Sequence, residues 1–126
     1  MASRDIQLMA HLMRRAGFGA TYEEIEARAA KGYEATVEEL LQPDGQPDLE
    51  MDLLERYYID WKEMNALEVN QSYLTYRMIN TKRPLQEKIA LFWHGIFCTG
   101  NSKCEHGRQI QEQLNMFRRL GMGSLR

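Results

Sequence analysis

The sequence predicts an all-α fold, a compact bundle of about six or seven short helices. Apolar residues recur at three- and four-residue spacing along most of the chain, and glycines and prolines separate these stretches. No stretch shows the alternation of polar and apolar residues that is typical of a half-buried strand. Because 126 residues is the usual size of one domain, we expect a single helical domain over residues 1–126, with a loop around 42–49.

Three helices are expected in the first part of the chain. The first, at about 4–16, has apolar residues along one face and ends at a pair of glycines. The second, at about 21–32, begins with Thr21 and Glu24, which form a capping-box signature. The third, at 33–41, ends before the Pro- and Gly-rich loop.

Further helices are expected after the loop. Apolar residues at helical spacing predict helices from Leu49 to about Lys62 and from about Ala66 to Asn80. Pro84 suits the first position of the next helix, because its missing amide would be unpaired there. The side chains of that helix expected to face the core are Leu85, Ile89, Phe92 and Ile96. The last helix ends at a glycine, and its apolar positions are Ile110, Leu114, Phe117 and Leu120.

The composition argues against several kinds of partner and location. Sixteen basic and eighteen acidic residues give a net charge of −2, so no nucleic-acid partner is expected. The apolar run around Ile89 to Trp93 is far shorter than the roughly 20 residues that cross a bilayer, so no membrane span is expected. The N-terminal residues lack the pattern of an export signal, which predicts a cytoplasmic protein.

The end of the sequence predicts association. Residues 123–126 have the pattern of a helix cap and the first residues of a further helix, as in a truncated piece of a larger helical protein. An apolar face that packs on missing elements would then be exposed. We therefore expect a homo-oligomer, and a closed two-fold dimer is its commonest form.

Several stretches together resemble a known family. They are His11–Thr21, Pro84–Lys88, Leu91–Phe97, Gln113–Arg118 and Leu120–Gly121. They resemble the N-terminal region of the bacterial domain-of-unknown-function family numbered 1800, and the resemblance covers nearly the whole chain. It implies a helical fold but no activity, and members of that family are often exported and usually longer. Cys98 and Cys104 depart from the family pattern, which commonly has small or apolar residues there.

The segment from His94 to His106 is a candidate metal site. His94 and Cys98 are four residues apart, which makes them neighbours on a helix, and Cys104 and His106 follow closely. Thiolate and imidazole are the ligands that Zn²⁺ prefers; four would close a structural site, and three would leave a position for water. The spacing matches no standard zinc-finger signature. There are two alternatives to a metal site. One is a capping histidine with a buried thiol, and the other is a Cys98–Cys104 disulfide in an oxidising compartment.

Two other sets of residues could carry chemistry. A catalytic zinc would need a base to activate its water, and Glu87 and Glu105 are the candidates. Arg14 and Arg15, beside two glycines, could hold an anion, although arginines in a last turn also simply favour the helix end. The sequence favours a helical scaffold or interaction domain of unknown biochemical role. The alternative is a small zinc-dependent enzyme of the hydrolase type, and the sequence leaves open which of the two applies.

Overall fold

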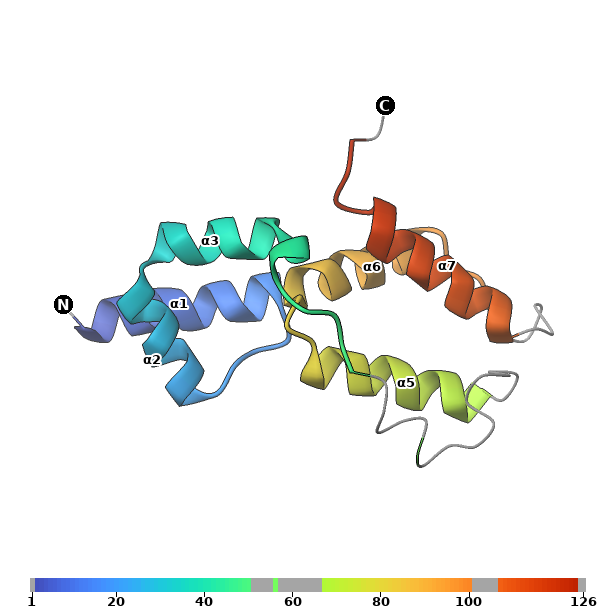
Figure 1. Cartoon of the computed structure of the whole chain (residues 1–126), viewed down its shortest axis with the longest axis horizontal. Coiled ribbons are helices and arrows are strands. Elements are labelled where there is room, and N and C mark those ends of the chain that lie inside the picture. Colours follow the sequence, from blue (N-terminus) through green and yellow to red (C-terminus); the bar gives the residue numbers. More distant parts are fainter. Residues whose placement is uncertain (1, 51–55, 57–66, 101–106, 125–126) are drawn as a thin grey trace.

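The protein folds into short helices (Figure 1). The computed structural model describes residues 2–50, 56, 67–100 and 107–124. These residues form six α-helices, one short 3₁₀ helix and no strand, which confirms the predicted all-α class. The helices are α1 (Ala2–Ala16), α2 (Tyr22–Lys31), α3 (Tyr33–Leu41), the 3₁₀ helix η1 (Pro43–Gly45), α5 (Leu67–Asn80), α6 (Pro84–Ile96) and α7 (Gly107–Leu120). None of the helices in these ranges is long and apolar enough to cross a membrane.

The first three helices pack against one another at one end of the molecule (Figure 1). Met9 and Met13 on α1 are fully buried, as the apolar spacing of this helix predicts. The predicted helix start at Thr21 is also confirmed, because the Thr21 hydroxyl oxygen accepts a hydrogen bond from the Glu24 amide at 3.3 Å. Arg28 of α2 forms an ion pair with Glu39 of α3 at 3.1 Å, which joins these two helices.

An apolar cluster lies between α6 and α7. Its buried members are Ala90, Leu114 and Phe117, and Leu74, Trp93 and Ile110 pack against them. The Trp93 indole donates a hydrogen bond to the Gly121 carbonyl at 2.9 Å, which fixes the end of α7 beside α6. A Cβ atom at Gly121 would lie 2.7 Å from the Trp93 ring, so this approach requires glycine.

Helix α6 also joins the two groups of helices, since it contacts α1 and α3 as well as α5 and α7. Gly17 follows α1, and a Cβ atom added there would lie only 2.9 Å from the Cβ atom of Pro84. The glycine therefore lets the end of α1 approach the start of α6 closely. Two of the stretches that carry the family resemblance meet at this contact.

Two predicted details of the helices are wrong. Leu49 and Glu50 are not helical, and most of the rest of the helix expected there lies outside the described residues. The Asp48 carboxylate accepts a hydrogen bond from the Leu49 amide at 2.7 Å, which holds this part of the chain in another conformation. On α6, Phe92 and Ile96 are 56% and 54% exposed, although the apolar spacing placed them in the core.

Candidate functional site

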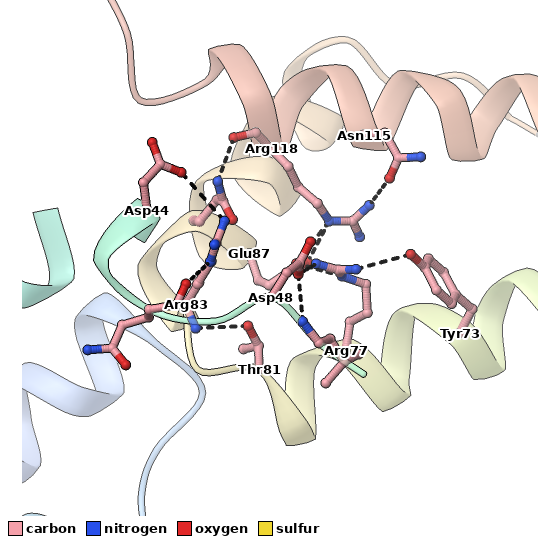
Figure 2. Close-up of polar contacts among 12 residues, drawn as sticks. Asp44, Asp48, Tyr73, Arg77, Thr81, Arg83, Glu87, Asn115 and Arg118 are labelled. Carbon is pink, nitrogen blue, oxygen red and sulfur yellow. Dashed lines mark hydrogen bonds and ion pairs between the residues drawn. The ribbon is translucent and has the colours of Figure 1, made fainter. Parts of the chain in front are cut away.

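A buried carboxylate joins three helices. Glu87 on α6 is only 2% exposed. Its Oε1 atom accepts hydrogen bonds from Nε of Arg77 on α5 at 2.7 Å and from Nε of Arg118 on α7 at 2.9 Å. Its Oε2 atom lies at 2.9 Å from the same Arg118 nitrogen. Both arginines are buried as well, and we call these three residues the Arg–Glu–Arg triad (Figure 2).

Further polar groups surround the two guanidinium groups of the triad (Figure 2). Arg77 donates to the Tyr73 hydroxyl at 3.1 Å and to the Asp48 carboxylate at 2.9 Å. Arg118 donates to the Asn115 side-chain oxygen at 2.7 Å. Both guanidinium carbons also lie within 6 Å of the centre of the Tyr73 ring, at 5.7 and 5.9 Å, a distance at which cation–π attraction acts. Both guanidinium groups of the triad therefore have hydrogen-bond partners besides Glu87.

The surroundings keep the outer ion pair charged at neutral pH. Burial lowers the pKa of Arg77, but the attraction of the Glu87 carboxylate and of Tyr73 outweighs it, and the net effect raises that pKa. Partial burial raises the pKa of Asp48, but the Leu49 amide and the Arg77 guanidinium outweigh this effect and lower it. Arg77 is thus a permanent cation that faces two carboxylates.

A cavity of about 730 Å³ opens beside the triad, which is within the usual size of small-molecule sites. It is lined by four arginines, two aspartates and five other residues: Arg77, Arg83, Arg118, Arg119, Asp44, Asp48, Pro43, Tyr73, Gln86, Asn115 and Met122. Arg83 donates from Nε to the Gln46 carbonyl at 2.8 Å, and its Nη1 lies 3.5 Å from Asp44. Arginine is the most frequent residue in its lining, and we call it the arginine cavity.

The candidate zinc ligands are only partly described. His94 is half-buried on α6, and Cys98 has a free, exposed thiol. Because α6 ends at Ile96, Cys98 lies beyond the helix, so the expectation that it shares a helical face with His94 is wrong. Cys104 and His106 lie outside the described residues. Among the residues that are described, no three His, Cys, Asp or Glu side chains form a group that could hold a metal ion.

The other candidates lie in different places. Glu87 is the centre of the triad, where both of its oxygens face guanidinium groups. Glu105 lies outside the described residues. Arg14 and Arg15 are exposed in the last turn of α1, and neither lines the arginine cavity.

Sequence reasoning missed most of the arginine cavity. Arg77 lies 10 residues before Glu87, and Arg118 lies 31 residues after it, so their contact depends on how the helices pack. The one available signal was the position of Glu87 in the first turn of α6, where a carboxylate favours the positive end of the helix dipole. That signal indicates a stabilising residue and does not identify its partners.

The comparisons agree with the family resemblance. A family model with the description "Protein of unknown function (DUF1800)" matches residues 11–126. No curated protein and no solved structure was found to match the chain. The description of the family gives no activity.

Proposed function

The chain belongs to the DUF1800 family, and we propose that it is a helical scaffold domain that pairs with a second copy of itself. The observation that carries this proposal is a group of exposed apolar side chains on and next to α6 and α7. Each of these side chains is at least 40% exposed, and we call them the α6–α7 surface: Phe92, Ile96, Phe97, Met116 and Leu120.

These side chains lie at spacings that suit helix packing. Phe92 and Ile96 are four residues apart on α6, and Met116 and Leu120 are four apart on α7, so each pair forms a stripe along its helix. Three members of the α6–α7 surface, Phe97, Met116 and Leu120, line a hollow of about 200 Å³. The other residues of its lining are Trp93, Phe117, Gly121, Gly123 and Ser124. Exposed apolar side chains that gather in this way are typical of interaction surfaces.

The uncharged lining of this hollow, as far as the structure describes it, favours a second copy as the partner. None of the described residues that line it has an ionisable side chain. A two-fold axis through such a surface brings identical residues together, and uncharged residues can meet in this way without like-charge repulsion. A strongly charged partner would find no complementary group among these residues. The α6–α7 surface thus fits another uncharged apolar surface, and the same surface of a second copy is one.

The mass of the protein in solution tests this proposal. At micromolar concentration, light scattering should give a mass of twice the 14.8 kDa of one chain. The double variant Ile96→Asp, Leu120→Asp should be monomeric, because it places charges where the two copies meet. The control is Ile79→Asp on α5, which replaces an even more exposed apolar residue, 75% exposed, and should remain dimeric. A monomeric wild-type protein would refute the proposal.

Zinc binding by the segment from His94 to His106 is a second candidate function. It is supported by His94, whose Nδ1 atom is buried and has no hydrogen-bond partner among the described residues. Such atoms normally have a partner, and imidazole nitrogen is a common zinc ligand. Cys98, Cys104 and His106 would supply the other ligands, and a site with only three of them would keep a water for hydrolysis. Glu105 is then the nearest base in sequence.

Elemental analysis tests zinc binding directly. Protein purified without chelators should contain about one zinc per chain, since a closed site binds one ion. Cys98→Ser and Cys104→Ser should each lower both the zinc content and the melting temperature if the ion is structural. Metal-free protein, together with variants that melt like the wild type, would exclude zinc binding.

A further inference from the structure

The arginine cavity has more guanidinium groups than carboxylates to bind them. Four arginines and two aspartates line it, and Glu87 of the triad adds a third carboxylate. One positive charge is left over, although the chain as a whole has a net charge of −2. We propose that this cavity binds a small molecule through a phosphate group.

Two of the arginines have donors that the protein does not use. The Nη2 atom of Arg118 is buried and has no hydrogen-bond partner among the described residues, although the rest of its guanidinium is bound by Glu87 and Asn115. A buried donor without a partner is unfavourable, so a ligand oxygen at this nitrogen would be stabilising. Arg119, the next residue on α7, is exposed and has no ion pair or hydrogen bond with the described part of the chain.

The carboxylates in the cavity can give way to a ligand. The Asp48 side chain is 62% exposed and that of Asp44 is 97% exposed, so either can turn toward water without burying a charge. Asp48 already shows that an oxyanion fits against Arg77, with an oxygen to nitrogen distance of 2.9 Å. Glu87, in contrast, is buried and keeps the triad in place when the outer carboxylates move.

A phosphate group fits these donors better than a carboxylate does. Arg83, Arg118 and Arg119 come from two helix ends and approach the cavity as three separate cations. A phosphate ester has about two negative charges at neutral pH and three free oxygens, whereas a carboxylate has one charge and two oxygens in a plane. The volume of about 730 Å³ leaves room for an organic part beside Met122 and Tyr73. The ligand class is therefore a small phosphate ester.

Calorimetric titration with glycerol phosphate tests this site at constant ionic strength. The wild-type protein should bind one molecule per chain in a saturable way. Arg119→Ala should weaken binding about tenfold, since it removes one charge-assisted contact and no contact within the described structure. Arg118→Lys should weaken it similarly, because lysine keeps the charge but has a single nitrogen, which cannot bind Glu87 and also occupy the position of Nη2. Asp48→Asn should strengthen binding, because a competing negative charge is removed.

Arg108→Ala is the matched control. Arg108 is an exposed residue on the same helix whose described partner is Glu112, so this variant removes one positive charge outside the cavity and should leave binding unchanged. Succinate, a dicarboxylate, should bind more weakly than glycerol phosphate. The proposal is overturned if no saturable binding occurs, if Arg108→Ala weakens binding as much as Arg119→Ala, or if succinate binds more tightly. If Arg118→Lys fails to fold, the comparison of Arg119→Ala with Arg108→Ala still tests the proposal.

Discussion

Replacing Glu87 with glutamine is expected to destabilise the fold much more than removing an exposed carboxylate. The Glu87 side chain is buried and accepts hydrogen bonds from two buried guanidinium groups. Glutamine has almost the same shape, so the packing of α6 is kept while the negative charge is lost. Arg118 would then have no carboxylate partner among the described residues, and Arg77 would keep only the exposed Asp48.

The size of this effect follows from the burial of the triad. Removing one partner of a buried ion pair costs about 3–5 kcal/mol, because the remaining charge stays buried without compensation. The glutamine oxygen can still accept one hydrogen bond, so we expect a value near the lower end, about 3 kcal/mol. That is a large part of the roughly 5–15 kcal/mol by which domains are stable, and it corresponds to a fall in melting temperature of roughly 10 °C.

Urea unfolding followed by circular dichroism measures this difference. The control is Glu112→Gln on α7, which removes the carboxylate of the exposed pair between Arg108 and Glu112, 3.2 Å apart. Exposed pairs of this kind contribute about 0.3–0.5 kcal/mol, so the control should unfold nearly like the wild type. If Glu87→Gln and Glu112→Gln lower the free energy of unfolding equally, the triad does not stabilise the packing of α5, α6 and α7.

Three further outcomes are expected. Gly121→Ala should destabilise the fold by about 1–3 kcal/mol, because its Cβ atom would lie 2.4 Å from the Phe117 carbonyl oxygen. Gly95→Ala in α6 should be stabilising, because nothing lies within 4 Å of the added Cβ atom. Thermal melts show whether each variant raises or lowers the melting temperature. Thr21→Ala should lower the free energy of unfolding by about 1 kcal/mol by removing the cap of α2, and Thr21→Ser should restore it. Because the pKa of Asp48 is lowered from 3.8, its ion pair stabilises the fold above that value and is lost as the pH falls through the lower folded-state pKa. The urea midpoint of the wild type should therefore fall more steeply below about pH 4 than that of Asp48→Asn.

The helices could be predicted from the sequence because their signals are local. The cap at Thr21 and the proline at the start of α6 act within one or two turns of the chain, and both are where the sequence placed them. The buried residues of α1 and α7 were also largely predictable, since Met9 and Met13 on α1, and Leu114 and Phe117 on α7, lie at helical spacing; the exception is Leu120, which is 59% exposed. For these elements, tertiary packing and local preference agree.

The buried face of α6 could not be predicted in the same way. Its most apolar stripe includes Phe92 and Ile96, which are exposed, while Glu87 and Ala90 are buried. A periodicity argument assumes that the apolar side faces inward, and charged residues are almost never buried unless they are paired. Glu87 is paired, but its two partners lie on other helices, and the pairing cannot be recognised from a single sequence. The arginine cavity, which depends on it, was missed for the same reason.

The triad also links the stability of the fold to the proposed phosphate site. Glu87 binds Arg118 through Nε, and Asn115 binds it through Nη1, so the remaining donor, Nη2, has a fixed direction before any ligand arrives. A donor that is already held in place loses little conformational entropy when a ligand binds, which is the usual reason why rigid sites bind more tightly than flexible ones. Arg119 lacks such support and can adapt its position to the ligand. Stability alone does not explain a carboxylate buried among arginines, because apolar residues of similar volume often stabilise a fold equally well or better. Its burial is understandable if the same arginines must also present donors to the cavity.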